Sequence, residues 1–379
     1  MEFKIIGKNG GAEKMDGRIC FPYKDDEQSM PEFVNGIAQI YGRMMDESSK
    51  EIFASRLLIS LTGSYSYMRS VVVHTPGGKK LNAVLNRDNN PQYIYGAGIR
   101  GKRLVQLFPD NNWGGFIDKN KNQDSYHGID ILELEQFMDR YSKGTAIIVS
   151  NMHGTQDIVD SLLKEDISSE DIYVLNDFDM ESAKDMYFPS DCVRAAIEKD
   201  KAFVDIGCYD GKDSLNYLKW IDDSKAKIYA FEPDVSNYRV CKENLNVHPN
   251  IELFNVGLSD REQKISVMGE GEMSYLGEGG NAKIQTQLLD NVLHNCAIGY
   301  IKMDVEGHEV NVLRGAEKII RSQHPVLAVS MYHKKSDIWR IPALLLEYNK
   351  EYSFYMRYYG AANGDTVLYV VDGSCRSIN

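Results

Sequence analysis

The sequence predicts an α/β protein. Its C-terminal half is expected to form a Rossmann-like parallel sheet closed by an antiparallel terminal hairpin. A smaller Rossmann-like α/β domain and a helical N-terminal segment precede it. Apolar runs at 93–95 and 203–206 each end in a glycine turn that opens a helix. The last two apolar runs, 352–359 and 366–371, are joined by so short a link that the final strand must be antiparallel.

Length and composition are those of an ordinary globular protein. The chain has 379 residues, 43% hydrophobic and 26% charged, which suits roughly two or three domains. The formal net charge of -12 argues against nucleic acid or an anionic membrane as the main partner. Six scattered cysteines form no C-x-x-C pair, so neither a disulfide framework nor a zinc site is indicated. Since no signal peptide or membrane-length apolar run is evident, we expect a cytoplasmic protein.

Residues 1–85 are expected to form the helical segment. The run 48–51 resembles a capping box, and Gly63 marks the end of the helix that follows it. Apolar residues occur at helical spacing between them, at Ile52, Phe53, Leu57, Leu58 and Leu61. No catalytic constellation is evident here, so we interpret the segment as a packing or dimerisation cap, which leaves a homo-oligomer open.

Residues 86–180 are expected to form the smaller Rossmann-like domain. The strand at 93–95 leads into a G-x-G-x-x-G turn, and the next strand ends in Asp118. Such a turn can hold a pyrophosphate and such an acid a ribose, so this segment predicts a second nucleotide or nucleotide-sugar site. The alternative is a module kept for docking or rigidity. The residues of this candidate site are Gly96, Gly98, Gly101 and Asp118.

The third unit, residues 181–379, begins with a strand that contains Asp205 and runs into a glycine turn. An acid at this place would repel a phosphate and suits a ligand with a cationic amino-acid portion, such as S-adenosylmethionine. The next strand ends in Glu232, whose carboxylate can accept hydrogen bonds from both ribose hydroxyls. A third strand ends near where the adenine edge is expected. The candidate cofactor-binding residues are Asp205, Gly207, Tyr209, Gly211, Glu232, Ser259 and Asp260.

The densest polar group of this unit lies in the run 302–309. Period-two spacing is expected to put Asp304 and Glu306 on one side of a strand end, at the edge where ligands bind in open α/β sheets. These acids could orient a substrate, remove a hydroxyl proton or hold a divalent cation. His333 ends the next strand and is expected to face the same cleft. Helix capping is the alternative; it fits the last two residues of the run and fits Asp304 poorly.

These motifs resemble the FkbM-type methyltransferase family over about residues 195–371. Its signature is matched at 301–309 and 313–316, and its other landmarks at 231–233, 289–290 and 325–334. The resemblance implies an S-adenosylmethionine-dependent O-methyltransferase that acts on a hydroxyl of a sugar, glycan or related natural product. It assigns Asp205, Gly207 and Glu232 to the cofactor and Asp304, Glu306 and His333 to the substrate. Ser330 departs from the family, because relatives often have a glutamate there.

Two other classes of function stay open. One is an NAD- or nucleotide-sugar-dependent enzyme that works from the Gly96 turn, with the C-terminal half as its partner domain. The other is a non-catalytic module that binds a nucleotide or adenosylmethionine. Methyl transfer needs in-line positioning of the two reactants and a base or a metal that helps to deprotonate the hydroxyl. The polar cluster around Asp304 is the candidate for the base or for the metal site.

Overall fold

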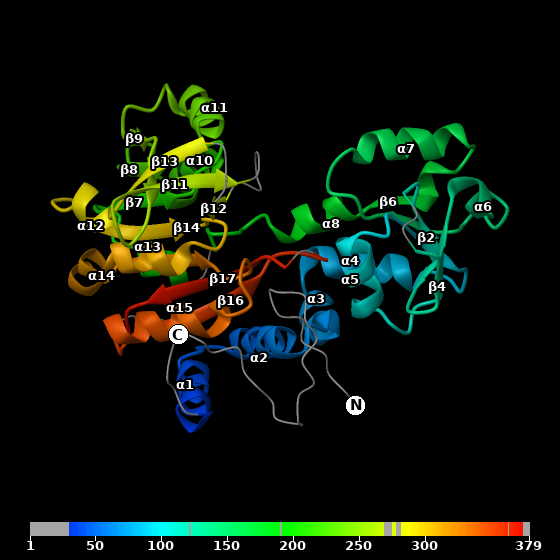
Figure 1. Cartoon of the computed structure of the whole chain (residues 1–379), viewed down its shortest axis with the longest axis horizontal. Coiled ribbons are helices and arrows are strands. Elements are labelled where there is room, and N and C mark those ends of the chain that lie inside the picture. The colour runs from blue at the N-terminus through cyan, green and yellow to red at the C-terminus, as the bar shows by residue number, and fades with distance from the viewer. Residues whose placement is uncertain are drawn as a thin grey trace. The chain divides into compact units, whose positions relative to one another are not determined.

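The computed structural model describes residues 30–120, 123–189, 192–268, 275–277, 282–362 and 364–373 (Figure 1). Contacts divide the chain into two units, Met1–Gln39 and Ile40–Asn379. The described part of the first unit is the beginning of helix α1 (Met30–Gly42). All other elements belong to the second unit. None of the helices in the described ranges is both long and apolar enough to span a membrane.

The segment 1–85, predicted to be helical, contains four more helices in the second unit. Its helices are α2 (Glu47–Thr62), η1 (Tyr65–Met68), α3 (Arg69–Val72) and α4 (Pro76–Leu85). Helix α2 ends at Gly63, as predicted, where the backbone is left-handed with φ of 74°. The predicted capping box at 48–51 is wrong, because the helix begins earlier. Asp46 is its N-cap, and its carboxylate accepts a hydrogen bond from the Ser49 amide at 2.7 Å.

The smaller sheet lies in the predicted second segment. Its strands are β1 (Gln92–Tyr95), β2 (Trp113–Ile117), β3 (Ser125–Tyr126), β4 (Ile129–Leu132), β5 (Ile147–Val149) and β6 (Ile172–Val174). They are ordered β3-β4-β2-β1-β5-β6, and all neighbours are parallel except β3 and β4. The chain thus moves outward from β1 in both directions, as in a Rossmann-like fold. Its helices are α5 (Ile99–Leu107), α6 (Leu134–Met138), α7 (Thr155–Lys164), η2 (Ser169–Asp171) and α8 (Leu175–Ser182).

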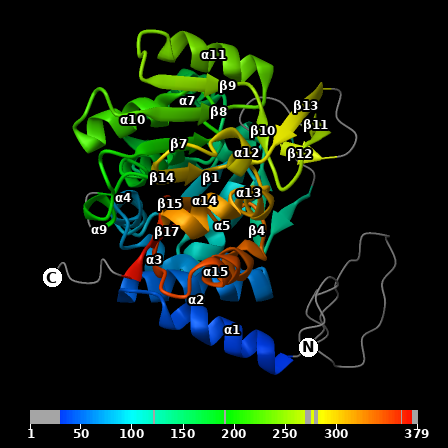
Figure 2. The same cartoon turned by 90° about the vertical axis from the view of Figure 1, so that its left-hand side faces the viewer.

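The larger sheet forms the C-terminal half. Its strands are β7 (Ala202–Ile206), β8 (Ile228–Phe231), β9 (Ile251–Phe254), β14 (Ile298–Met303), β15 (Val326–Ser330), β16 (Ser353–Tyr358) and β17 (Thr366–Val371). Their order is β16-β17-β15-β14-β7-β8-β9, which Figure 2 shows from β9 to β17. Strand β17 is antiparallel to both of its neighbours, and the other pairs are parallel. This confirms the predicted class I methyltransferase topology.

The connections differ from the prediction in two places. The sequence predicts a single helix over 307–320, but the structure has two shorter helices there, α13 and α14, whose bounds are given below. Four short strands between β9 and α12 form a separate sheet ordered β10-β13-β11-β12, which the sequence did not indicate. They are β10 (Gly257–Leu258), β11 (Gln263–Met268), β12 (Tyr275–Gly277) and β13 (Ala282–Gln287). The helices of this half are α9 (Cys192–Ala195), α10 (Lys212–Ile221), α11 (Val235–Leu245), α12 (Leu289–Val292), α13 (Glu309–Gly315), α14 (Glu317–Gln323) and α15 (Asp337–Tyr348).

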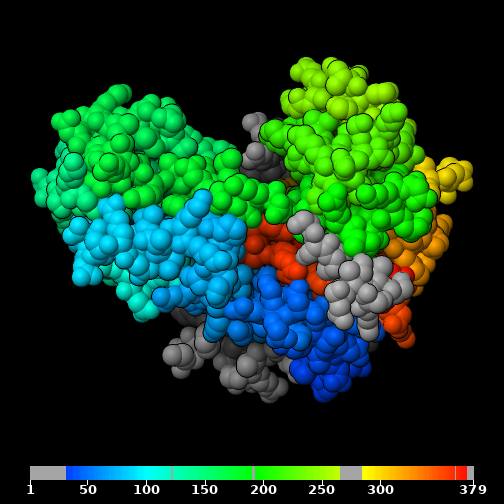
Figure 3. Space-filling view, turned by 180° about the vertical axis from the view of Figure 1, so that it is seen from behind, coloured from blue at the N-terminus to red at the C-terminus, as the bar shows by residue number. Residues whose placement is uncertain are grey.

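Helix α2 covers the edge strand of the larger sheet. The Ser49 hydroxyl accepts a hydrogen bond from the Met356 amide at 2.8 Å, and Arg357 forms an ion pair with Asp46 at 2.8 Å. In Figure 3 the blue residues of α2 and the red residues of the C-terminal hairpin accordingly adjoin. The predicted packing cap therefore blocks the free edge at β16.

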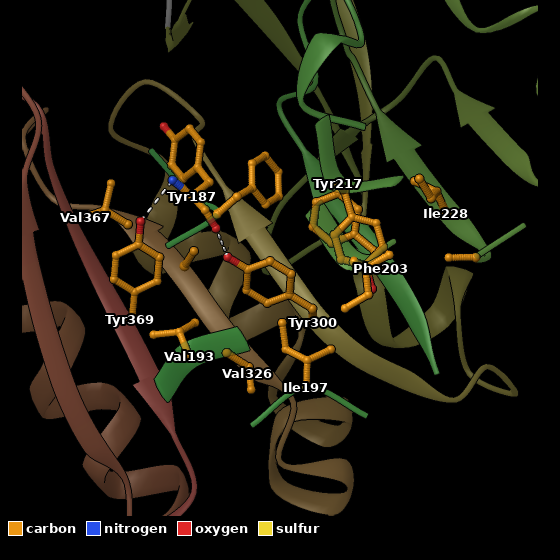
Figure 4. Packing of buried hydrophobic residues seen from close by; sticks show 14 of the residues in the cluster. Tyr187, Val193, Ile197, Phe203, Tyr217, Ile228, Tyr300, Val326, Val367 and Tyr369 are labelled. Atoms are coloured by element: carbon orange, nitrogen blue, oxygen red, sulfur yellow. Dashed lines mark hydrogen bonds between the residues drawn. The ribbon is translucent and has the colours of Figure 1, made fainter. Parts of the chain in front are cut away.

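An aromatic cluster under the larger sheet positions one loop of the site (Figure 4). The ring of Phe203 stacks on Tyr217 at 4.2 Å and on Tyr300 at 5.3 Å between centroids. The Tyr300 hydroxyl donates to the Tyr187 carbonyl, and the Tyr187 amide donates to the Tyr369 hydroxyl at 2.9 Å. Burial of these large rings stabilises the sheet and fixes the backbone of Tyr187 beside β14 and β17.

Candidate active site

A cleft of about 690 Å³ opens at the carboxyl edge of the larger sheet. Loops that follow β7, β8, β9 and β14 line it. The predicted cofactor residues Gly207, Tyr209 and Glu232 and the predicted substrate residues Asp304 and Glu306 all lie in this lining. The sheet topology thus brings two groups of residues, far apart in sequence, into one cleft.

The turn after β7 depends on a glycine. Gly207 has φ of 75°, and a Cβ atom there would lie 1.8 Å from the carbonyl oxygen of Asp304. Only glycine lets the turn pass so close to the end of β14. Tyr209 follows with φ of 49° and is 39% exposed. Gly211 lies outside the cleft lining, where it packs against Cys241 and Leu245 and precedes α10.

Asp205 lies beneath the cleft rather than in its wall. It is fully buried and sits beside Lys302 on the neighbouring strand, with 3.1 Å between Oδ1 and Nζ. Lys302 also forms an ion pair with Asp213 at 3.3 Å and donates to the Gly207 carbonyl at 2.7 Å. Burial opposes the charge, but Asp205 and Asp213 raise the pKa of Lys302 above its usual value. Lys302 therefore supports the turn. Asp213, which the sequence did not indicate, lines the cleft together with Lys302.

Glu232 is held by backbone amides at the end of β8. Its Oε2 accepts from the Tyr209 amide and its Oε1 from the Asp234 amide, both at 2.9 Å. The side chain is only 5% exposed, and burial raises the pKa of Glu232 to about 7. Each carboxylate oxygen keeps a lone pair for a further donor, so Glu232 can still accept hydrogen bonds from a diol.

Apolar side chains surround this carboxylate. Phe231 stacks on Phe254 with 4.8 Å between ring centroids, and Pro233 and Leu258 line the same part of the cleft. An adenosine fits this combination of apolar walls and one orienting carboxylate. Ser259 and Asp260 lie outside the lining: the Ser259 hydroxyl lies 2.9 Å from Nε2 of His308 and 3.1 Å from Oδ1 of Asp260. Their predicted role at the adenine stays a prediction.

Asp304 follows β14 and is oriented by two phenols. The Tyr187 hydroxyl donates to Oδ2 at 2.7 Å, and the Tyr332 hydroxyl donates to the same oxygen at 3.1 Å. Burial and then the charge of Asp304 hold the pKa of both tyrosines well above their usual value, so they stay protonated donors. Helix capping does not engage the Asp304 carboxylate in this structure. The N-cap residue of α13, His308, makes no side-chain capping hydrogen bond. Glu309 begins the helix, and its Oε1 accepts from the Val305 and Gly307 amides of the preceding turn at 3.3 and 3.2 Å.

His333 lies between three carboxylates. Its Nδ1 is 2.8 Å from Oε1 of Glu309, and its Nε2 is 3.3 Å from Glu306 and 3.4 Å from Asp304. Burial alone would lower the pKa of His333, but Glu306 and Glu309 raise it to about 11. The ring is therefore an imidazolium at neutral pH. It can orient the acids but cannot accept a proton.

Strand periodicity does not place Asp304 and Glu306 in the cleft, because both residues lie in the loop after β14. Both follow the last residue of β14, and Glu306 lies in a left-handed turn with φ of 52°. Asp304, Glu309 and His333 also offer ligand atoms within 4.8 Å of one another. A divalent cation could occupy that place only in exchange for the proton on His333.

The family comparison agrees with this geometry. The family model described as "Methyltransferase FkbM domain" matches residues 205–361. Residues 205–361 therefore resemble an FkbM methyltransferase domain, and this stretch is called the FkbM domain below. The chain is 29% identical to the 2-O-methyltransferase NoeI of Sinorhizobium fredii, over 32% of this chain and 59% of that protein. The match thus spans less than two thirds of that relative.

Solved structures resemble the chain more distantly. The FkbM methyltransferase of Methylobacillus flagellatus is 16% identical, with a TM-score of 0.43 over 83% of this chain and all of that one. Aeropyrum pernix fibrillarin with bound S-adenosyl-L-methionine is 9% identical, with a TM-score of 0.31 over 46% of this chain and 68% of that one. Likeness at this level adds nothing about the chemistry of the cleft.

The predicted second site lies outside the FkbM domain, at the turn after β1. Asp118 accepts hydrogen bonds from the Ala97 and Asn120 amides, both at 2.8 Å. Gly96 has φ of 100°, and a Cβ atom there would lie 2.7 Å from Oδ1 of Asn151. A Cβ atom at Gly101 would lie 2.3 Å from the Gly96 carbonyl oxygen. Gly98 is the N-cap residue of α5. Packing accounts for Gly96 and Gly101, whereas a Cβ atom at Gly98 would meet nothing within 4 Å. Nucleotide binding here stays a prediction.

Asp365, Arg56 and Arg103 also line the cleft and were not predicted from the sequence. Asp365 lies in the link between β16 and β17, and burial and then Asp179 raise its pKa to about 7. Arg56 on α2 and Arg103 on α5 reach the cleft from outside the FkbM domain. No motif marks these three positions. The short link before β17 was visible in the sequence, but its neighbours in space were not.

Proposed function

We propose that this protein transfers a methyl group from S-adenosylmethionine to a hydroxyl of a sugar, glycan or related natural product. The observation that carries this proposal is the shared cleft, in which Gly207 and Glu232 adjoin Asp304 and Glu306. The FkbM domain supports methyl transfer. An oxygen nucleophile is supported by the relative described as a 2-O-methyltransferase.

The residues of the β7–β8 end would bind the methyl donor. Glu232 would accept hydrogen bonds from the ribose hydroxyls, while Phe231, Pro233 and Leu258 pack around the adenine. Asp213 faces the cleft beside Lys302 and would pair with the ammonium group of the donor. When bound, the donor supplies a methyl group already activated by its sulfonium.

The residues after β14 would prepare the acceptor. Asp304 would accept the hydroxyl proton as the acceptor oxygen forms its bond to the methyl carbon and the carbon–sulfur bond breaks. Tyr187 and Tyr332 keep the Asp304 carboxylate in a fixed orientation. His333 is a positioning residue, since its imidazolium is held by Glu306 and Glu309 and cannot be the base.

A labelled-donor assay tests the proposal. The full chain would be incubated with methyl-labelled S-adenosylmethionine and a panel of sugars, nucleotide sugars and polyols, and products would be analysed by mass spectrometry. We expect label in an O-methyl group of one acceptor class. If calorimetry shows that the folded chain does not bind S-adenosylmethionine, the proposal is wrong. If it binds and no acceptor is methylated, a sensor of adenosylmethionine replaces the enzyme.

A further inference from the structure

Two arginines from outside the FkbM domain reach the acceptor side of the cleft. Arg56, on α2, is only 8% exposed, and Arg103, on α5, is half-buried. Both line the cleft together with Gly364 and Asp365, which directly precede β17. A charged side chain at such a place normally has a carboxylate partner. Among the described residues, neither arginine forms an ion pair with a carboxylate.

The hydrogen bonds of Arg56 leave most of its guanidinium unused. Its Nη2 donates to the Met331 carbonyl at 3.3 Å, and its buried Nε has no partner among the described residues. Its Nη1 would lie 3.4 Å from a Cβ atom at Gly364. A buried guanidinium with one long backbone bond lacks compensation for its charge, and an anion in the cleft would supply it.

Arg103 lies close to the same point. Its guanidinium lies 4.9 Å from the Tyr65 ring centroid, and its Nη1 donates to the Ala362 carbonyl at 3.5 Å. The Tyr65 hydroxyl would lie 3.7 Å from a Cβ atom at Gly364. Burial raises the pKa of Tyr65, and Arg103 and Arg56 both oppose that rise. Both guanidinium groups thus lie near Tyr65, and the neighbouring Gly364 lines the cleft.

Glu232, the acid proposed to bind the methyl donor, lies at a different part of the sheet edge from the two arginines. Glu232 follows β8, whereas Arg56 contacts the backbone after β15, three strands away, or roughly 14 Å at the usual spacing of strands. Asp365 shares the arginine end. Because burial and then Asp179 raise its pKa to about 7, Asp365 is partly protonated at neutral pH and opposes an anion only weakly. Two guanidinium groups thus share this end of the cleft with one partly protonated carboxylate, that of Asp365.

We infer that the methyl acceptor carries an anionic group, a phosphate or a carboxylate, and that Arg56 and Arg103 bind it while the hydroxyl lies at Asp304. This inference rests on the proposed function. Phosphate and carboxylate groups both accept paired hydrogen bonds from a guanidinium. The feature that the two arginines would recognise is therefore an anionic group with at least two oxygen atoms. A phosphate would come from a sugar phosphate or nucleotide sugar, and a carboxylate from a uronic acid.

Calorimetry on the full chain saturated with S-adenosylhomocysteine tests the inference. The probes are glucose 1-phosphate, UDP-glucose, glucuronate and the neutral methyl glucoside. We expect at least one anionic probe to bind tenfold or more tightly than methyl glucoside, roughly the effect of one strong charge-assisted pair. The phosphate and glucuronate arms distinguish the two sources. Arg56→Gln and Arg103→Gln should each remove most of that preference, and Arg103→Lys should keep part of it.

Arg140→Gln is the matched control, because Arg140 pairs with Asp130 at 3.2 Å on the surface and does not line the cleft. An unchanged affinity for S-adenosylhomocysteine in each variant shows that the fold and the donor site are intact. If no anionic probe binds better than methyl glucoside, or if both variants keep the full preference, the inference is overturned. Loss of S-adenosylhomocysteine binding by the unmodified chain would instead overturn the proposed function.

Discussion

The protein contains two glycine turns of similar construction with different surroundings. Each follows the first strand of a Rossmann-like sheet, and in each the acid after the next strand accepts an amide of the turn. Asp118 binds the Ala97 amide in the smaller sheet, and Glu232 binds the Tyr209 amide in the larger one. Local sequence and local hydrogen bonding therefore do not distinguish them.

The two glycine turns differ in the groups that surround them. The turn at Gly207 opens into the cleft, and its acid is buried against apolar walls. Near the turn at Gly96, the buried Arg100 forms an ion pair with Asp179, whose Oδ1 accepts the Ala361 and Ala362 amides at 2.6 and 3.1 Å. One turn thus faces a ligand cleft, and the other helps to attach the smaller sheet to the hairpin link that carries Asp365.

The largest effect is expected at Asp304. Asp304→Asn keeps the size of the side chain but removes its charge, so turnover should fall by ~10²–10⁴-fold, as for loss of a general base. Donor affinity should be unchanged. Asp118→Asn is the matched control in the other sheet and should leave turnover within about twofold. Steady-state kinetics and calorimetry on both variants check this, and equal turnover losses would remove the distinction between the two turns.

The next largest effect is expected on stability. Asp179→Ala leaves the buried Arg100 without its carboxylate partner, which should lower the free energy of unfolding by about 3–5 kcal/mol. Chemical denaturation measures this. The surface variant Asp130→Ala, which breaks only the exposed pair with Arg140, should cost under about 1 kcal/mol. A similar cost for both variants would contradict the attachment role of the Gly96 turn.

Glu232→Ala should weaken S-adenosylmethionine binding by about 2–3 kcal/mol, because it removes charge-assisted hydrogen bonds to the ribose. Calorimetry with Glu232→Gln, which retains one carbonyl acceptor, should give an intermediate loss. Far-ultraviolet circular dichroism controls for folding, since the Tyr209 amide loses its acceptor in the alanine variant. Unchanged affinity in folded Glu232→Ala protein would place the donor elsewhere.

Donor affinity should also depend on pH. The pKa of Glu232 is raised to about 7, and ribose hydroxyls donate best to the ionised carboxylate. Affinity should therefore rise with pH through 7, by about tenfold between pH 6 and pH 8, and then level off. The slope should disappear in Glu232→Gln. A slope that persists in this variant would assign the titration to another group.

The smallest effect is expected from nucleotides at the Gly96 turn. Its motif predicts a nucleotide site, so at least one of NAD, UDP-glucose and GDP-mannose should raise Tm slightly, whereas a turn kept for attachment alone would show no change. A thermal-shift screen of the wild type and of Asp118→Ala checks this. A stabilisation that is lost in Asp118→Ala would establish the second nucleotide site.

The sequence predicted the elements that have strong local patterns. Apolar runs and glycine turns located the strands of the larger sheet and four strands of the smaller one, and β17 has the predicted bounds. They did not mark β3 and β4. The small sheet of β10–β13 was missed, because its strands are short and polar. Asp205 shows a further limit of local reasoning: its position at a strand end was read correctly, but its pairing with Lys302 arises across two strands that lie far apart in sequence.

The candidate site was predicted in the same uneven way. Glu232, Asp304 and Glu306 follow strands that the pattern located, so their convergence on one edge followed from topology. His333 was expected to face that edge and does, but its charge depends on Glu309, which local sequence assigned to capping. Arg56 and Arg103 enter from helices outside the domain, and their arrival depends on tertiary packing alone.

A crystal structure of the full chain with S-adenosylhomocysteine would show whether the cleft after β7 holds the methyl donor. We expect the ligand to occupy this cleft, with its ribose hydroxyls within hydrogen-bonding distance of Glu232 and its sulfur directed toward Asp304. A ligand bound at the Gly96 turn, or one whose sulfur points away from Asp304 and Glu306, would contradict this expectation.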